Sequence, residues 1–184
     1  MKEIKVKDLM VLLDDYATVH QDATLRDAIL ALEKAQKAFQ KQEYTHRAVL
    51  AVDDDRQVVG KLGMIDVLRA LEPKYSEMGS FRSISHIGFD PEFIRSMIDK
   101  YELWQHAMEQ ACERASLLRV REIMYRPTAG ELVSTEATLD EAIHHIVVGH
   151  HQSLLAVENG RVVGVLRLAD VFAQICKTIK ACKA

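Results

Sequence analysis

Apolar positions along the chain recur with the period of a helix in some segments and form short continuous runs in others. After Thr24, and again after Thr138, apolar residues return every three or four positions, as they do on one face of a helix. Each of these segments leads into two short apolar runs separated by polar residues, which is typical of a hairpin, and then into another helical segment. The predicted strands are 17–19, 48–52 and 58–62 in the first half of the chain and 131–133, 153–157 and 161–166 in the second.

Four short motifs occur twice, in the same order. The first is valine, a base, an acid, an apolar residue and methionine, at 6–10 and 120–124. The other three pairs are 24–29 with 138–143, 46–52 with 151–157, and 58–67 with 162–171. Because the motifs keep their order and nearly keep their spacing, the chain contains two copies of one β-α-β-β-α unit.

The boundaries of the repeated elements also agree. Thr24 with Asp27, and Thr138 with Glu141, have the spacing of a helix N-cap and an acid three residues later. Residues 53–55 form the predicted turn of the first hairpin, and Asn159-Gly160 forms that of the second, where Asn-Gly is a strong turn signal.

Residues 73–116 lie between the repeats and match neither of them. The stretch 73–85 is polar and predicts a loop. Asp90-Pro91 is a typical helix start, and an apolar stripe that includes Trp104, the only tryptophan, predicts one long helix over 91–117. Two interpretations of this helix remain open: it covers its own module as a linker, or it forms a surface for dimerisation or a protein partner.

Composition and charge exclude several classes of protein. The net charge of −3 argues against a nucleic-acid-binding protein, because such proteins usually carry an excess of positive charge. No apolar run reaches the roughly 18 residues of a membrane span, and no signal peptide is apparent, so we expect a soluble cytoplasmic protein. The three cysteines form no CxxC and are expected to be free thiols. Common nucleotide-binding, hydrolase and metalloprotease motifs are missing, which argues against an enzyme.

The repeated motifs resemble those of CBS domains, the cystathionine-β-synthase type, arranged as a tandem pair or Bateman module. The resemblance covers about residues 3–72 and 117–180. It implies an α+β fold in which two β-α-β-β-α units, 1–72 and 117–184, pack as a pseudo-two-fold pair, with 73–116 as an insertion. It also implies a homodimer, because CBS pairs commonly pack as two-chain discs.

The resemblance further implies a site for an adenosine-containing ligand. In CBS pairs, the aspartate of the motif G-x-x-[ST]-x-x-D typically accepts hydrogen bonds from ribose hydroxyls, and Asp66 and Asp170 match it. Gly63 and Arg167 stand where serine or threonine is usual. Arg167 could clamp a phosphate, which makes the second site the better candidate, or it could equally fill the cleft or form an ion pair with an acid. The remaining candidates are Lys61 for phosphate, Val133, Leu155 and Ala156 around adenine, and His151, which occupies the same repeat position as His46.

Three functions follow as hypotheses. The first is a stand-alone regulatory module that binds AMP, ADP or ATP between its repeats, needs no cofactor and signals to an unidentified protein. The second is a dimeric scaffold whose cleft is filled by its own side chains and whose inserted helix docks a protein. The third is metal sensing through the histidines of 144–151, although adjacent His144 and His145 point about 100° apart on a helix. Polar turn or cleft-lining roles explain these histidines more simply.

Overall fold

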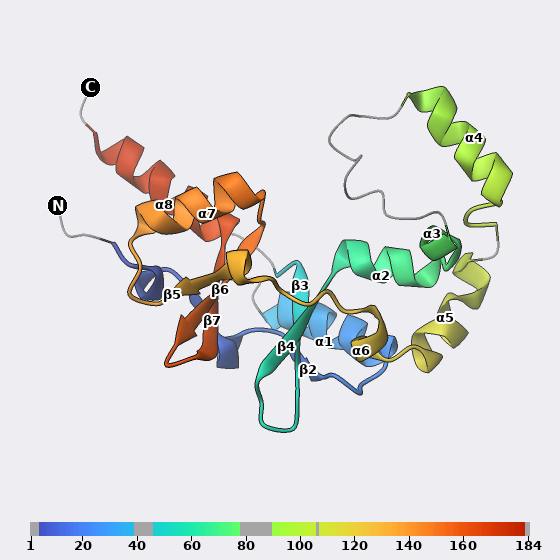
Figure 1. Ribbon diagram of the computed structural model, residues 1–184, viewed down its shortest axis with the longest axis horizontal. Coiled ribbons are helices and arrows are strands. Elements are labelled where there is room, and N and C mark those ends of the chain that lie inside the picture. The colour runs from blue at the N-terminus through green and yellow to red at the C-terminus, as the bar shows by residue number, and fades with distance from the viewer. Residues whose placement is uncertain (1–3, 39–45, 78–89, 106, 183–184) are drawn as a thin grey trace.

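The computed structural model describes residues 4–38, 46–77, 90–105 and 107–182, which form two similar units and an insertion (Figure 1). Unit 1 denotes the described residues up to 72, and unit 2 those from 117. The elements of unit 1 are the 3₁₀ helix η1 (Val6–Asp8), β1 (Val11–Leu12), the 3₁₀ helix η2 (Leu13–Asp15), β2 (Thr18–His20), α1 (Leu25–Ala38), β3 (Ala48–Val52), β4 (Val58–Gly63) and α2 (Met64–Leu71).

Unit 2 repeats this order except for β1, which has no counterpart among its described strands. Its elements are α6 (Val120–Ile123), the 3₁₀ helix η4 (Ala129–Glu131), β5 (Leu132–Ser134), α7 (Leu139–Gly149), β6 (Ser153–Glu158), β7 (Arg161–Arg167) and α8 (Leu168–Ala181). In each unit a parallel strand pair, β2–β3 or β5–β6, is extended by an antiparallel hairpin partner, β4 or β7. The predicted β-α-β-β-α repeat is therefore confirmed.

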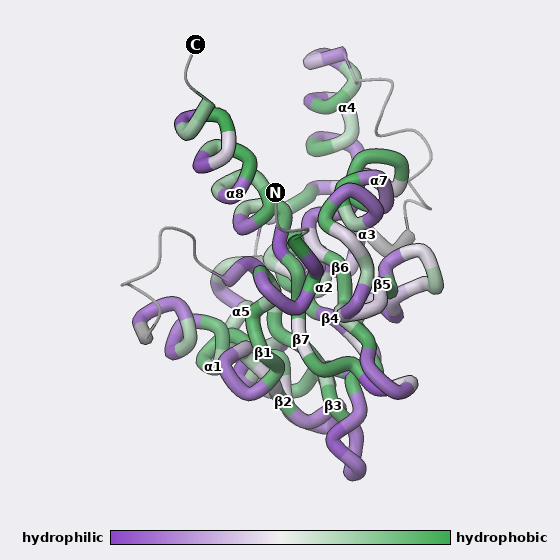
Figure 2. Tube along the Cα trace, turned by 90° about the vertical axis from the view of Figure 1, so that its left-hand side faces the viewer, coloured by the Kyte–Doolittle hydropathy of each residue, from purple (hydrophilic) through white to green (hydrophobic). Residues whose placement is uncertain are grey.

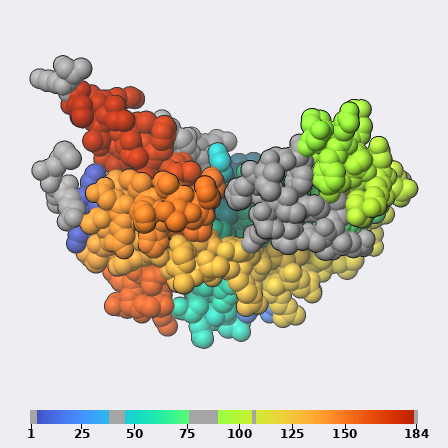
Figure 3. Space-filling model, turned by 45° about the horizontal axis from the view of Figure 1, so that its top comes forward, coloured from blue at the N-terminus to red at the C-terminus, as the bar shows by residue number. Residues whose placement is uncertain are grey.

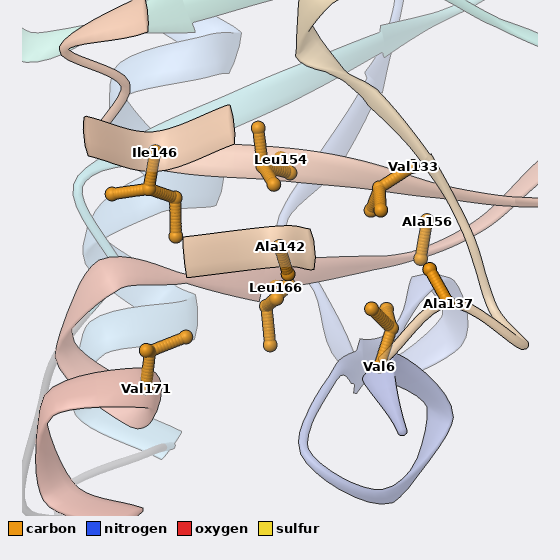
Figure 4. Packing of buried hydrophobic residues seen from close by; sticks show 9 residues of the cluster. All are labelled: Val6, Val133, Ala137, Ala142, Ile146, Leu154, Ala156, Leu166 and Val171. Carbon is orange, nitrogen blue, oxygen red and sulfur yellow. The ribbon is translucent and has the colours of Figure 1, made fainter. Parts of the chain in front are cut away.

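The opening segment of each unit crosses to the other unit. Strand β1, which the sequence did not predict, pairs with β7 and gives the second sheet the order β1-β7-β6-β5. Val6 is fully buried in the core of unit 2 (Figure 4). In return, Val120 and Met124 lie in the core of unit 1. The apolar residues of the two opening motifs therefore stabilise the contact between the units.

Local hydrogen bonds explain why the helices begin where they do. The Thr24 hydroxyl accepts the Asp27 N–H at 3.1 Å, and the Asp27 carboxylate accepts the Thr24 N–H at 3.0 Å. Thr138 likewise caps α7 by accepting the Glu141 N–H. In the second hairpin, Asn159 and Gly160 both have positive φ, as the predicted tight turn requires.

The prediction of one helix over 91–117 is wrong. The insertion forms α4 (Pro91–Tyr101) and α5 (Ala107–Leu117), separated by a corner where Glu102 and Trp104 adopt the left-handed conformation. The corner forms because Leu103 is buried and the Trp104 N–H donates to the carboxylate of Glu72 at 2.7 Å. A short helix, α3 (Lys74–Glu77), lies inside the predicted loop, and 78–85 falls outside the described residues.

The two inserted helices have different surroundings. Helix α5 packs against α1 and α2, and its Ala115 lies in the core of unit 1, so α5 covers its own module. Helix α4 stands out from the rest of the molecule (Figures 1 and 3) and leaves Phe93, Ile94 and Ile98 nearly half exposed. Green and purple alternate along α4 and α8 in Figure 2, as expected for helices with one apolar face.

Candidate functional site

The clearest candidate site lies where β7 runs into α8. Arg167 is the last residue of β7 and the N-cap of α8, and Asp170 lies in the first turn of that helix. The Leu168 N–H donates to the Gln152 carbonyl at 3.0 Å, which holds the start of α8 against the beginning of β6. Arg167 Nε lies 2.5 Å from Asp170 Oδ2, and Nη2 lies 2.6 Å from Oδ1. The two residues therefore form a bidentate ion pair, and only 7% of Arg167 is exposed.

Two buried rings from unit 1 face this ion pair. Tyr16 and His46 meet edge to face with their ring centroids 4.3 Å apart. Burial raises the pKa of Tyr16 to about 12, with the Arg167 charge lowering it and the Asp170 charge raising it. Burial also lowers the pKa of His46, and the charge of Arg167 acts in the same direction. Both rings are therefore neutral near pH 7, so Arg167 and Asp170 are the charged members of this group of four side chains.

A cavity of about 590 Å³ opens on the other side of the pair. One wall is the segment Leu9–Leu12 with Asp15, from unit 1, and the other is the first half of α8, from unit 2. On the α8 side the lining residues are Arg167, Asp170, Ala173, Gln174 and Lys177. A smaller hollow of about 320 Å³ continues along α8 and shares Gln174 and Lys177 with it. The volume is in the range of small-molecule sites, and the walls combine apolar surface with charges of both signs.

The equivalent position in unit 1 has different chemistry. Asp66 accepts the Gly63 N–H at 2.9 Å, and Gly63 stands where unit 2 has Arg167. Lys61, two residues earlier on β4, forms an ion pair with Glu131 at 2.9 Å. Burial alone would raise the pKa of Glu131, but hydrogen bonds from Tyr125 and Lys61 outweigh it and lower that pKa. Lys61 is therefore held by a buried carboxylate between the two units.

Comparison with known proteins identifies the family. A family model described as "CBS domain" matches residues 6–73 and 116–177. The chain belongs to the CBS domain family. Its two units form a tandem CBS pair, as the sequence predicted. No curated protein matches the chain.

Solved structures share the CBS-pair fold over nearly the whole chain. CBSX2 in complex with AMP is 16% identical and has a TM-score of 0.60, with 95% of this chain and 97% of that chain covered. A CBS domain-containing protein from Kribbella flavida is 14% identical, with a TM-score of 0.59 and 94% and 98% covered. A putative acetoin utilization protein from Vibrio cholerae is 17% identical, with a TM-score of 0.59 and 97% and 94% covered. At these identities the likeness shows the fold.

The structure brings together only part of the predicted CBS ligand site. Arg167 and Asp170 share one cavity, whereas Val133 and Ala156 lie in the core of unit 2 (Figure 4) and Leu155 in the apolar cluster between the sheets. These three side chains are at most 4% exposed, so the apolar wall of the cavity comes from Leu9–Leu12 instead. Tyr16 and Lys177 were not predicted from the sequence. The shared repeat position of His46 and His151 was the available signal for His46.

The histidines near the end of α7 lie apart from this cavity. His151 packs against Gly149, where an added Cβ would lie 2.1 Å from its Nε2. His145 Nδ1 lies 3.3 Å from the Gly130 carbonyl oxygen, and His150 caps α7 in the left-handed conformation. Among the residues that the structure describes, no three His, Cys, Asp or Glu side chains are grouped as metal ligands. Within those same residues, every helix is too short or too polar to span a membrane.

Proposed function

We propose that this CBS pair is a regulatory protein that binds an adenosine-containing ligand, of the AMP, ADP or ATP type, in the cavity beside Arg167 and Asp170. The observation that carries the proposal is the cavity itself, whose walls come from both units and carry two carboxylates, Asp15 and Asp170, and two cations, Arg167 and Lys177. One solved structure with this fold, CBSX2, is a complex with AMP. The role is regulatory rather than catalytic, in keeping with the family.

The chemistry of the cavity suits such a ligand. A carboxylate such as that of Asp170 accepts hydrogen bonds from the two hydroxyls of a ribose. The guanidinium of Arg167 and the ammonium of Lys177 provide partners for phosphate. Arg167 also stands at the N-terminus of the 14-residue helix α8, where backbone N–H groups favour an anion.

The position of the cavity suggests how binding regulates the protein. A ligand that touches both Leu9–Leu12 and α8 contacts unit 1 and unit 2 at once. It therefore favours the arrangement of the units in which both walls reach it, and it shifts the population toward that arrangement. A protein partner that binds the ligand-bound and ligand-free arrangements with different affinity then responds to the ligand concentration.

We further propose that the chain acts as a homodimer. Helices α2 and α8 expose large apolar residues, among them Ile65 at 62% and Phe172 at 57%. Both helices lie on the same side of the two sheets (Figure 1). A second copy related by a two-fold axis presents the same apolar residues and covers them.

One observation favours the alternative, a scaffold that works without a ligand. Arg167 already occupies both oxygens of Asp170, and the side chains of Tyr16 and His46 are buried. In that case the exposed apolar face of α4 (Phe93, Ile94 and Ile98) is the surface for a protein partner.

A thermal-shift screen with AMP, ADP, ATP, adenosine and S-adenosylmethionine distinguishes the two functions. At a ligand concentration 100-fold above Kd, one site adds about 2.7 kcal/mol, a shift of several degrees. The shift should disappear in Ala173→Trp, whose indole fills the cavity, and persist in Arg69→Trp, at the equivalent position of α2. No shift with any of the five compounds would reject the ligand-binding function and favour the scaffold.

A further inference from the structure

The Arg167–Asp170 ion pair occupies the oxygens that a bound ribose needs. Each carboxylate oxygen already accepts a guanidinium N–H, at 2.5 and 2.6 Å. We propose that Arg167 is an internal latch on Asp170 that a phosphate-bearing ligand releases, so that the cavity selects nucleotides over nucleosides. This inference rests on the function proposed above and identifies which ligands that site accepts.

The preference for nucleotides over nucleosides depends on whether the Arg167 guanidinium has a negatively charged partner after the ligand has bound to Asp170. A nucleoside offers Asp170 two neutral hydroxyls, but to use them it must displace a cation that is only 7% exposed. Removing one partner of such a poorly hydrated ion pair is strongly unfavourable, because the other charge is left without compensation. A nucleotide instead brings an anion whose geometry matches the guanidinium fork. Arg167 then moves from carboxylate to phosphate while Asp170 turns to the ribose, and both charges stay paired.

The groups around the pair support this exchange. On the inner side, Tyr16 and His46 are buried and neutral near pH 7, so they offer no negative charge to a released guanidinium. On the cavity side, Asp15 is exposed, so an ion pair with it would be weakened by water. Lys177 lines the same cavity and adds a second cation for the phosphate. Compared with these groups, a ligand phosphate offers Arg167 a partner with full negative charge and matching geometry.

The equivalent position of unit 1 lacks the latch. Gly63 has no side chain, and Asp66 accepts the Gly63 N–H. Asp66 also forms a long ion pair with the half-exposed Arg69 guanidinium at 3.7 Å, in place of the bidentate pair of Asp170. A Cβ added at Gly63 would lie 3.3 Å from Asp66 Oδ2, so a small side chain fits there with slight adjustment. Tyr16 of unit 1, which lies near the Arg167–Asp170 pair, corresponds in the repeat to Gly130 of unit 2, at which an added Cβ would meet its nearest atoms at 3.9 Å. The larger side chains, Tyr16 and Arg167, therefore gather at only one of the two pseudo-symmetric positions.

The test compares the dissociation constants of AMP and adenosine by calorimetry on the wild type and on Arg167→Ser. Because a charge-assisted hydrogen bond changes affinity by about 10- to 100-fold, the wild type should prefer AMP by that factor. In Arg167→Ser the carboxylate is released and the phosphate partner is lost. Adenosine should therefore bind more tightly, AMP more weakly, and the preference should fall to about 3-fold or less, the remainder reflecting Lys177.

Two further variants keep the result interpretable. Arg161→Ser, at the exposed start of β7, should leave the preference for AMP unchanged. Arg167→Lys keeps the positive charge but lacks the two parallel N–H donors of a guanidinium. Its preference for AMP over adenosine should therefore lie between those of the wild type and Arg167→Ser. If the wild type binds AMP and adenosine equally, or if Arg167→Ser retains the preference, the latch is rejected while ligand binding stands. If the wild type binds neither AMP nor adenosine, and also gives no binding heat with ADP or ATP, the proposed function fails and the latch with it.

Discussion

Gly164 lies so close to the backbone of Val11 that a Cβ on it would sit 2.7 Å from the Val11 carbonyl oxygen. The same Cβ would lie 2.9 Å from the Met10 thioether. In unit 1, a Cβ on Gly60 would lie 2.2 Å from the Met124 thioether. The repeated Val-Val-Gly and Val-x-x-x-Met motifs are therefore two sides of one contact, made twice, in which each opening segment crosses the hairpin of the other unit.

The two glycines should not be equally sensitive to substitution. At Gly164 the obstacle is the backbone of β1, which cannot move without losing its pairing to β7, so we expect Gly164→Ala to cost about 3 kcal/mol of unfolding free energy. At Gly60 the closest atoms belong to the flexible side chain of Met124, so Gly60→Ala should cost about 1 kcal/mol. Urea denaturation measures both values. A larger loss for Gly60→Ala would contradict this account of the crossing.

The Lys61–Glu131 ion pair should make stability depend on acid pH. The pKa of Glu131 is lower when folded than its ordinary value of 4.5, so its contribution is present above pH 4.5 and is lost as the pH falls below it. Glu131→Gln should cost about 1–3 kcal/mol at pH 7 and less at pH 3.5, measured by urea denaturation. Glu33→Gln, in an exposed pair with Lys37, should change little at either pH. A cost for Glu131→Gln that is equal at the two pH values would exclude the pair as its source.

The corner between α4 and α5 should depend on Glu72. This buried carboxylate accepts the N–H of Trp104 at 2.7 Å and that of Lys74 at 3.2 Å. Glu72→Ala leaves these donors without their acceptor, so we expect a loss of about 1–3 kcal/mol. Since Trp104 is the only tryptophan, its fluorescence should shift to longer wavelength as the corner opens. The control Glu113→Ala, on the exposed part of α5, should leave the emission unchanged, and an unshifted spectrum in Glu72→Ala would show that another contact holds the corner.

The proposed homodimer can be tested by analytical ultracentrifugation. We expect the wild type to sediment at twice the chain mass of 20.8 kDa. Ile65→Glu or Phe172→Glu places a charge in the apolar contact between copies and should give a monomer. Met108→Glu, at an exposed position of α5, should remain a dimer. A monomeric wild type would exclude the homodimer. A dimer in all three variants would show that the two copies associate through another surface.

The sequence predicted most of the fold because local physics and repetition agree. Thr24, Thr138 and Asn159-Gly160 mark helix starts and a turn through contacts within a few residues, and the second copy of each motif confirms the first. Strand β1 and the corner at Trp104 were not predicted because they depend on distant partners, β7 and Glu72. Arg167 and Asp170 were both predicted because they fall in one short motif of the CBS resemblance, whereas Tyr16 comes near them only when the two units pack together.

The central claim is that an adenine nucleotide binds beside Arg167 and Asp170. It is tested most directly by calorimetric titration of AMP into the wild type and into the double variant Arg167→Ala/Asp170→Ala, which removes both charges and leaves neither one unpaired. We predict a wild-type isotherm that is lost in the double variant, with both proteins showing the same circular dichroism spectrum. A wild type that gives no binding heat and no thermal stabilisation with AMP, ADP or ATP, or a double variant that binds as tightly as the wild type, would contradict the claim.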